Sequence, residues 1–304
     1  MFRIKAFADY KVTKIEKGWS GDKKFLLEKG REKLLLRVSD INKYEQKQYE
    51  FETLKKLELL EIPTSRPIDF GIDDEGKHVW MVLTWVKGQD LKEMILNFSE
   101  KDQYNFGVEA GKILQKIHEV EIVKPEISWE EHFNAKINQK LKMYDECKFR
   151  IPGGEAFKIY IEENRHLLKG RPQRFHHGDY HIGNMILTPE ENLIPIDFNR
   201  LDFGDPWDDF NRIVFCKEIS PAFATGRVDG YFNGIVPDEF WRLLALYISS
   251  NMLSSLPWAI DFGEQEIAFM KKLAVNVLKD YDNMKTSIPA WYKSTNFCQR
   301  LVCQ

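Results

Sequence analysis

Two short segments in the second half of the chain constrain its fold more than any other feature of the 304 residues. The first, His177 to Asn184, reads HGDYHIGN, and the second is Ile196-Asp197-Phe198. Between them lie two short apolar runs separated by a polar turn at residues 189–192, a pattern typical of a β-hairpin. Such a hairpin would bring Asp197 back beside Asn184.

Three side chains in these segments are suited to phosphoryl transfer. That reaction needs a carboxylate that accepts the hydroxyl proton, for which Asp179 is placed, and oxygen ligands for Mg²⁺, which Asn184 and Asp197 offer. The catalytic loop of protein kinases has the same five-residue step from Asp to Asn. We therefore predict Asp179 as the catalytic base, Asn184 and Asp197 as metal ligands, and direct in-line transfer from a nucleoside triphosphate to an acceptor hydroxyl.

A third segment, Gly204-Asp205-Pro206-Trp207-Asp208-Asp209, completes a resemblance to a known family. With the two segments above, it resembles the aminoglycoside phosphotransferase family, whose members have a protein-kinase-like fold. The resemblance implies Mg²⁺ as cofactor, ATP or GTP as phosphoryl donor, and a role in antibiotic resistance. It also implies that His177 props the catalytic loop, while Asp209 is expected to brace that loop rather than to do chemistry.

The same resemblance implies an α+β fold of two lobes. Residues 1–86 would form a small, antiparallel-sheet lobe that binds the nucleotide, and residues 87–304 a larger, mainly helical lobe that carries catalysis and binds the acceptor. Residues 84–88 would be the hinge, where Thr84 and Val86 offer backbone groups to the nucleotide base. The pattern also predicts strands at residues 68–72 and 78–83 and a core helix at residues 106–118.

The first residues predict strands at 11–16, 24–28 and 33–38, with a glycine turn at 18–21 whose Ser20 and Gly21 would cover the phosphates. Arg37 stands where protein kinases keep a phosphate-holding lysine on the third strand. A guanidinium holds phosphate oxygens too, but with a different geometry. Glu50, on a helix predicted at residues 42–60, is our candidate for the ion-pair partner of Arg37, with Glu52 second.

Several carboxylates are candidates for binding a cationic aminoglycoside-like acceptor, because acidic groups attract and orient amino-sugars. They are Glu130, Glu131, Asp202, Asp261 and Glu264, with Glu266 as a further member. A metabolic small-alcohol kinase acting on choline, homoserine or a sugar stays open, since the same catalytic groups would serve. A non-catalytic nucleotide-binding module is a third interpretation, which the substitution at Arg37 favours.

A protein kinase is disfavoured, because only eleven residues separate Asp197 from Asp209 and no Ala-Pro-Glu follows. The net charge of −3 and the lack of a basic run interleaved with aromatic residues argue against nucleic-acid binding. Four scattered cysteines, no apolar leader and no apolar run near ~20 residues favour a cytoplasmic protein that does not bind membranes. The sequence predicts no oligomeric state.

Overall fold

The computed structural model describes residues 4, 7–16, 21–121 and 125–293. The chain separates into two compact units. The first unit combines Met1–Leu91 with Asn184–Leu201, and the second combines Lys92–Gly183 with Asp202–Gln304. The segment that carries Asn184 and Asp197 therefore folds with the N-terminal residues. The predicted lobe boundary between residues 86 and 87 stays a prediction.

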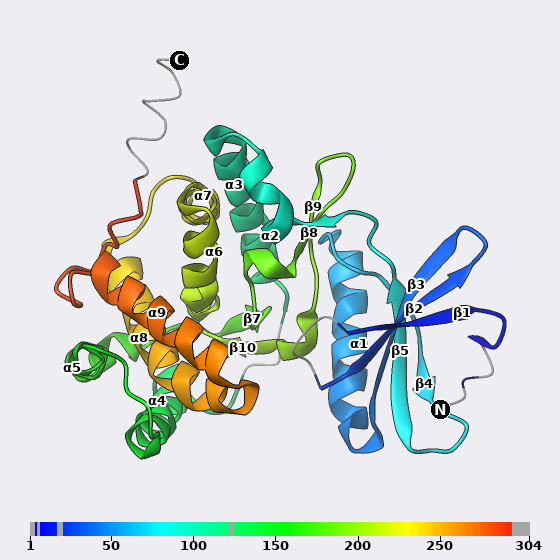
Figure 1. Cartoon of the computed structure of the whole chain (residues 1–304), viewed down its shortest axis with the longest axis horizontal. Coiled ribbons are helices and arrows are strands. Elements are labelled where there is room, and N and C mark those ends of the chain that lie inside the picture. The colour runs from blue at the N-terminus through cyan, green and yellow to red at the C-terminus, as the bar shows by residue number, and fades with distance from the viewer. Residues whose placement is uncertain (1–3, 5–6, 17–20, 122–124, 294–304) are drawn as a thin grey trace. The chain divides into compact units, whose positions relative to one another are not determined.

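The first unit is built on a five-stranded antiparallel sheet with strand order β1-β2-β3-β5-β4 (Figure 1). The five strands predicted from the sequence are confirmed. Gly30 and Gly76 have φ of 63° and 70° in the turns before β3 and β5, a region that side chains rarely adopt. The strands are β1 (Lys11–Ile15), β2 (Lys23–Lys29), β3 (Glu32–Asp40), β4 (Pro67–Ile72) and β5 (His78–Thr84).

Strand β3 presents two different faces because successive side chains of a strand point to opposite sides. Leu34, Leu36 and Val38 belong to a buried apolar cluster. Arg37, which alternates with them, therefore points to the other face, where it reaches a side chain of α1 (Tyr44–Leu59). The predicted helix at 42–60 is confirmed, with its α-helical part beginning at Tyr44 after a 3-10 turn capped by Asp40.

The hairpin predicted between Asn184 and Asp197 is confirmed. It consists of β8 (Met185–Leu187) and β9 (Leu193–Pro195), which form a three-stranded sheet with β6 (Gln89–Asp90) in the order β6-β8-β9. Gly88, just before β6, lies against the hairpin, since an added Cβ there would be 2.4 Å from the carbonyl oxygen of Leu187. Only glycine allows this close approach of two backbones.

The second unit is mainly helical (Figure 1). A short two-stranded antiparallel sheet pairs β7 (Arg174–His176) with β10 (Asp202–Gly204), and the HGDYHIGN segment follows directly after β7. The predicted core helix at 106–118 is confirmed as part of α3. The helices are α2 (Leu91–Met94, which begins at the last residue of the first unit), α3 (Glu100–Ile117), α4 (Trp129–Glu146), α5 (Glu155–Asn164), α6 (Ile213–Ile219), α7 (Pro221–Phe232), α8 (Asp238–Ala259) and α9 (Glu264–Asp280).

Helices α3 and α7 pack backbone to backbone through glycines. An added Cβ at Gly107 of α3 would lie 2.2 Å from the carbonyl oxygen of Phe223, and one at Gly226 of α7 would lie 2.1 Å from that of Tyr104. Helix axes approach this closely only where small residues line the contact. This contact places α7, and with it Arg227, against the middle of the unit.

Helix α8 qualifies the expectation drawn from the apolar runs. The segment Asp238–Phe262 has 25 residues and contains an 18-residue window with a mean hydropathy of 1.3, so by length and composition it is long and apolar enough to cross a membrane. In the structure, 72% of its most apolar window is buried inside the protein, as in the core helix of a globular unit. Leu243, Leu246 and Leu253 on this helix are fully buried.

Candidate active site

The backbone of the HGDYHIGN loop is held by one buried carboxylate. Asp209 accepts hydrogen bonds from the N–H of His177 at Oδ2 and from the N–H of Gly178 at Oδ1, both at 2.8 Å. The N–H of Asp179 then donates to Nδ1 of the fully buried His177 at 3.3 Å. Gly178 has φ of 80°, a conformation that glycine adopts without strain. Asp209 therefore holds the loop that carries Asp179 through hydrogen bonds to the backbone of that loop.

Asp209 is itself fixed by a network in the core of the second unit. Burial alone would raise the pKa of Asp209, but the hydrogen bond from His118 and the nearby imidazoles hold that pKa well below its ordinary value. Burial lowers the pKa of His118, so its ring is neutral, with Nε2–H donating to Asp209 (3.2 Å) and Nδ1 accepting from Tyr231 (2.8 Å). Arg227, fully buried, donates to the carbonyl oxygens of Tyr180 and Asp209 at 2.8 and 3.0 Å.

The carboxylate of Asp179 stays partly accessible. Its side chain is 19% exposed, and within the second unit Oδ1 lies 3.3 Å from Nε of Arg212 and 3.8 Å from Nε2 of His181. Burial lowers the pKa of His181 to about 4 even though Asp179 opposes the shift, so this imidazole is neutral at pH 7. Arg212 is therefore a cation directly beside Asp179. Sequence reasoning missed it, because no motif marks an arginine three residues after Asp209.

Asn184 and Asp197 are brought together in the first unit. The hairpin closes with a hydrogen bond of 2.9 Å from the N–H of Ile196 to the carbonyl oxygen of Asn184, so the residues that flank the hairpin are neighbours. Asp197 has φ of 67° and ψ of 59°, a left-handed conformation that is uncommon for a residue other than glycine or asparagine. Its side chain is 22% exposed.

The face of the first sheet that carries Arg37 holds a buried network of two cations and two carboxylates. Arg37 pairs with Glu50 (Nη1 to Oε1, 2.5 Å), and its Nε and Nη2 both donate to Asp22. Lys47 contacts Asp22 at 2.7 Å and Glu50 at 2.9 Å, and Ser39 donates to Asp22 at 2.6 Å. The ion pair expected between Arg37 and Glu50 is thus formed.

The two further ions of this network were not foreseen. Burial would raise the pKa of Asp22, but the adjacent Arg37 and Lys47 hold that pKa well below its ordinary value. Lys47 lies one helical turn before Glu50, a spacing that the sequence shows but that many exposed helices share. Glu52, the second candidate partner of Arg37, instead pairs with Lys55 at 2.9 Å on the exposed side of α1.

A second cation of the sheet, Lys24, lies beside Asp197. Lys24 on β2 is the direct cross-strand neighbour of Arg37 on β3. Its Nζ is 3.1 Å from Oδ2 of Asp197, whereas Nη2 of Arg37 is 4.0 Å from Oδ1 of the same carboxylate. No pattern in the sequence distinguishes Lys24 from its lysine neighbour Lys23.

The donor set at the hairpin fits a magnesium ion. Mg²⁺ prefers oxygen ligands and is commonly held by one or two protein side chains together with phosphate oxygens. Asn184 offers an amide oxygen and Asp197 a carboxylate, both at the ends of one hairpin. Among the described residues, no group of three or more His, Cys, Asp and Glu side chains is arranged to hold a metal alone.

The other residues predicted to bind the nucleotide are in the predicted glycine turn before β2 and at or just after the end of β5. Ser20 lies outside the described residues, and Gly21 is exposed two residues before β2. Thr84 ends β5, where its N–H donates to the carbonyl oxygen of Arg66 at 2.8 Å, so that N–H is already engaged. Val86 lies in the extended segment that leads to β6.

The acceptor carboxylates predicted from the sequence lie in two places of the second unit. Glu130 and Glu131 are in the first turn of α4, and Asp202 is exposed on β10, whose Gly204 lies against the Trp129 ring at the start of that helix. Asp261 is exposed in the 3-10 turn that follows α8, and Glu264 is exposed at the start of α9, where Glu266 is half-buried in the same first turn. The predicted carboxylates therefore lie on two separate sets of elements, α4 with β10 and the end of α8 with the start of α9.

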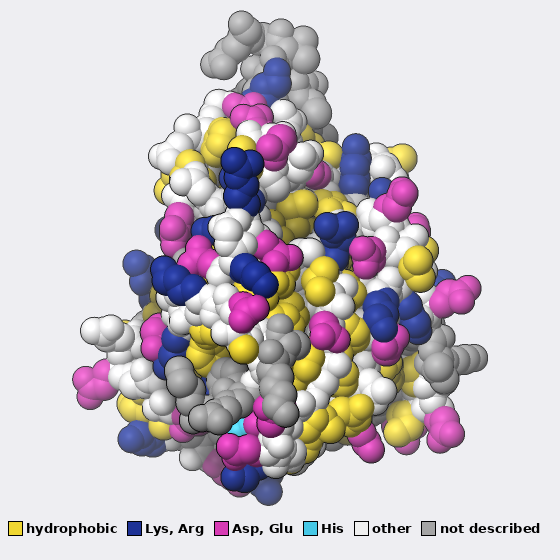
Figure 2. Space-filling view, turned by 90° about the vertical axis from the view of Figure 1, so that its right-hand side faces the viewer, with side chains coloured by type: hydrophobic (Ala, Val, Ile, Leu, Met, Phe, Trp, Pro, Cys, Tyr) yellow, Lys and Arg dark blue, Asp and Glu magenta, His cyan; other side chains and the backbone are white. Residues whose placement is uncertain are grey.

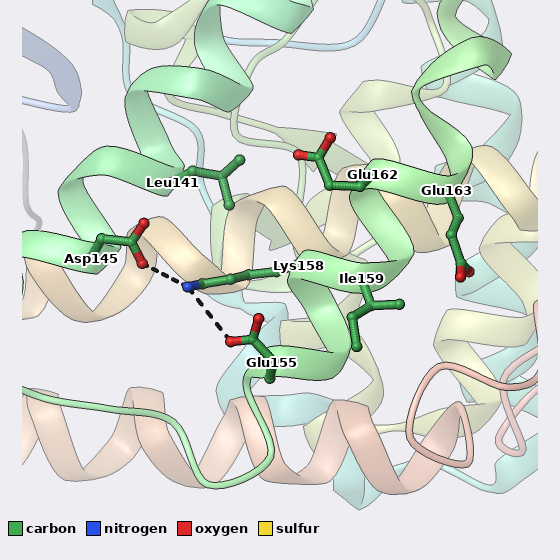
Figure 3. A pocket seen from close by; sticks show the side chains of 7 residues that line it. All are labelled: Leu141, Asp145, Glu155, Lys158, Ile159, Glu162 and Glu163. Carbon is green, nitrogen blue, oxygen red and sulfur yellow. Dashed lines mark hydrogen bonds and ion pairs between the residues drawn. The ribbon is translucent and has the colours of Figure 1, made fainter.

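A surface groove of about 490 Å³ between α4 and α5 includes none of the predicted residues. Figure 3 shows Lys158 bridging Asp145 and Glu155 along one side of it. The face drawn in Figure 2 carries basic and acidic side chains interspersed with hydrophobic ones, without a wide area of one sign among the described residues. The groove therefore contains no residue predicted to take part in catalysis or metal binding.

Comparison with solved structures places the fold. The GDP complex of aminoglycoside 2'-phosphotransferase-IIIa has a TM-score of 0.67 and 14% identity, over 88% of this chain and 91% of that one. A thermostable mutant of aminoglycoside phosphotransferase APH(4)-Ia, in a ternary complex with ADP and hygromycin B, has a TM-score of 0.64 and 15% identity, over 90% and 95%. Choline kinase LicA from Streptococcus pneumoniae has a TM-score of 0.60 and 15% identity, over 87% and 92%. The expected α+β, protein-kinase-like two-lobed fold is confirmed.

Comparison of the sequence itself places the chain in a family. A search of curated proteins found no significant match. The profile of the phosphotransferase enzyme family, APH, matches residues 11–243, which include the first sheet, the HGDYHIGN loop, the hairpin and Asp209. Since this match covers most of the chain, the chain belongs to the phosphotransferase enzyme family.

Proposed function

We propose that the chain is a small-molecule kinase that transfers the γ-phosphoryl group of ATP or GTP to a hydroxyl of an aminoglycoside-like acceptor. The observation that carries the proposal is the pair of hydrogen bonds by which Asp209 holds the backbone of the HGDYHIGN loop. A buried carboxylate fixes the N–H groups of His177 and Gly178, while the next side chain, Asp179, keeps a partly exposed carboxylate. A catalytic base needs this combination of fixed backbone and accessible oxygen.

In the proposed reaction, Asp179 accepts a hydrogen bond from the acceptor hydroxyl and takes its proton as the oxygen attacks the γ-phosphorus. The bond from the γ-phosphorus to the bridging oxygen breaks in line, and the nucleoside diphosphate leaves. The metal, when bound, neutralises charge that builds up on the phosphate oxygens. Asn184 and Asp197 hold it, and no phosphorylated enzyme intermediate is needed.

The first unit binds the donor in this proposal. The glycine turn that includes Ser20 and Gly21 covers the phosphates with backbone N–H groups, as the sequence predicts. Thr84 and Val86 border the base, with Val86 offering its backbone. Arg37 and Glu50 keep the phosphate side of the sheet ordered through their buried pairing. A nucleoside triphosphate donor also agrees with the cytoplasmic location that the sequence predicts.

The acceptor is proposed to be a cationic amino-sugar held by carboxylates of the second unit. Glu130 and Glu131 at the start of α4, Asp202 on β10, and Asp261 and Glu264 around the turn between α8 and α9 would each bind an ammonium group of such an acceptor. Support from relatives is limited to what they bind: the APH(4)-Ia complex contains ADP and hygromycin B, and the 2'-phosphotransferase complex contains GDP.

A metabolic small-alcohol kinase is the second candidate, and Arg212 favours it. The guanidinium lies 3.3 Å from Asp179, next to the hydroxyl that would react. A cation at this position repels an acceptor whose ammonium is close to the hydroxyl and attracts one with a carboxylate there, as in a hydroxy-amino acid. Choline, with its quaternary ammonium two carbons from the hydroxyl, is the less suitable acceptor of this group.

The experiment that tests the proposal is a measurement of nucleoside-diphosphate release with Mg²⁺. ATP and GTP are tested separately against aminoglycosides, choline, homoserine and sugars, with Asp179→Asn as the matched control. We expect release that depends on an aminoglycoside and disappears in Asp179→Asn. Release only with homoserine or a sugar would replace the first candidate by the second. Nucleotide binding without release for any acceptor would favour a non-catalytic module and contradict the proposal.

A further inference from the structure

We propose that Lys24 on β2, rather than Arg37 on β3, is the side chain that contacts the phosphate groups of the bound nucleotide. This inference rests on the proposed function and refines it, because it assigns the phosphate-binding cation of the same site to a different strand. It arises from how the two neighbouring cations of the first sheet are partnered, and all the residues involved belong to the first unit.

Arg37 is committed to the protein. Its side chain is 4% exposed, and each of its three nitrogens donates to a carboxylate: Nη1 to Glu50, and Nε and Nη2 to Asp22. A guanidinium has five N–H groups in a fixed plane, so turning it toward a ligand breaks several of these contacts at once. Asp22 and Glu50 would then share Lys47 as their cation, and buried carboxylates that lose a partner destabilise a fold strongly.

The position of Lys24 suits a contact with phosphate groups. It is the cross-strand partner of Arg37, so both side chains leave the same face of the sheet. Its side chain is 15% exposed, more than Arg37, and its Nζ is already 3.1 Å from the carboxylate of Asp197, the proposed metal ligand. Phosphate oxygens that bind the same metal as Asp197 would lie close to Asp197, and therefore close to Lys24.

The ammonium group suits a shared position between Asp197 and phosphate. It has three N–H donors on a flexible stem, so one donor can stay on the carboxylate while the others bind phosphate oxygens. Hydrogen bonds between an ammonium and an anion are among the stronger ones in proteins. Arg37 then acts indirectly: by holding Asp22 and Glu50, it keeps β3 and α1 in place behind Lys24.

The test is calorimetric binding of nucleoside, diphosphate and triphosphate with Mg²⁺ to the full chain and to single variants. Lys24→Met is compared with Lys23→Met, a matched control that removes the same charge from the neighbouring, exposed residue on the opposite face of β2. We expect Lys24→Met to bind the triphosphate about tenfold more weakly or worse, since a charged hydrogen bond is lost. Its affinity for the nucleoside and its melting temperature should match those of the wild type.

Two further variants keep the inference open to contradiction. Lys24→Arg should recover part of the triphosphate affinity, and Arg37→Lys should lower the melting temperature while it retains the difference in affinity between nucleoside and triphosphate. The inference is overturned if Lys24→Met binds the triphosphate as the wild type does, or if it loses nucleoside affinity by the same factor. A wild-type chain that binds no nucleotide would overturn the proposed function and this inference together.

Discussion

Each unit contains a buried network of charge that holds some of the candidate residues, and the two networks are built differently. The Asp209 network uses a single carboxylate, which accepts from two backbone N–H groups and from the neutral ring of His118. The Arg37 network joins two cations and two carboxylates, Arg37, Lys47, Asp22 and Glu50, by contacts between side chains. The first network fixes a loop through one carboxylate, and the second fixes a sheet and a helix through several pairs of side chains.

The difference indicates what each network does. A carboxylate that binds backbone N–H groups sets the path of the chain, and here it sets the path immediately before Asp179. Paired side chains tie two elements together but leave the backbone to its own hydrogen bonds. We therefore expect the Asp209 network to control catalytic geometry and the Arg37 network to control mainly the stability of the first unit.

Replacing Asp209 should give the largest effect. Asp209→Ala leaves the N–H groups of His177 and His118's Nε2–H buried without their acceptor, at a cost of about 3–5 kcal/mol in the free energy of unfolding. Misplacement of Asp179 should lower kcat about a hundredfold or more in the molecules that fold. Denaturant unfolding and steady-state kinetics measure the two effects. Asp209→Asn, which keeps one acceptor oxygen, should fall between, and an unchanged kcat in either variant would contradict the positioning role.

Replacing Arg37 should give the next largest effect, and mainly on stability. Arg37→Met leaves the buried Asp22 and Glu50 with Lys47 alone and should lower the free energy of unfolding by about 3 kcal/mol. Lys47→Met should cost less, because Arg37 still pairs with both carboxylates. Urea titrations of the two variants compare them directly. If both variants lost the same free energy of unfolding, Arg37 would not compensate for the loss of Lys47, and our description of the network would be wrong.

The pH dependence of stability should separate the networks with a smaller effect. The folded-state pKa of Asp22 and of Asp209 is lowered, so their contributions are present above about pH 4 and are lost below it. The pKa of His118 is also lowered, and that of His181 falls to about 4. Below about pH 6.5 these histidines become protonated in the unfolded chain but stay neutral in the folded chain. The free energy of unfolding therefore falls already between pH 6.5 and 4.

This decline should come from the second unit, because the Arg37 network contains no histidine. We expect a loss of up to about 3 kcal/mol across that range for a shift the size of that in His181. His181→Gln should make the dependence on pH shallower. Urea unfolding at pH 7, 5.5 and 4.5 tests this, and a wild-type stability that stays constant down to pH 4.5 would contradict it.

The sequence predicted those features that depend on residues close together in the chain. The hairpin between Asn184 and Asp197 was predicted from two apolar runs and a turn. The pairing of Glu50 with Arg37 was predicted because Glu50 lies on the apolar face of its helix. The strands of the first sheet follow from alternation and glycine turns.

The features that sequence reasoning missed depend on distance in space between residues that no pattern connects. Asp22 precedes a strand, and its burial between Arg37 and Lys47 is decided by the packing of three elements. Lys24 and Lys23 read alike until the register of β2 with β3 places one of them beside Asp197. Arg212 and the glycine contact of α3 with α7 likewise follow from the packing of the second unit.

The most direct test of the account is the effect of Asp179→Asn on phosphoryl transfer and on nucleotide affinity, measured in the same preparation. The account predicts that kcat falls about 10²- to 10⁴-fold, as expected when a general base is lost, while the affinity for the Mg²⁺–nucleotide complex stays close to that of the wild type. A variant that transfers the phosphoryl group at the wild-type rate would contradict the account.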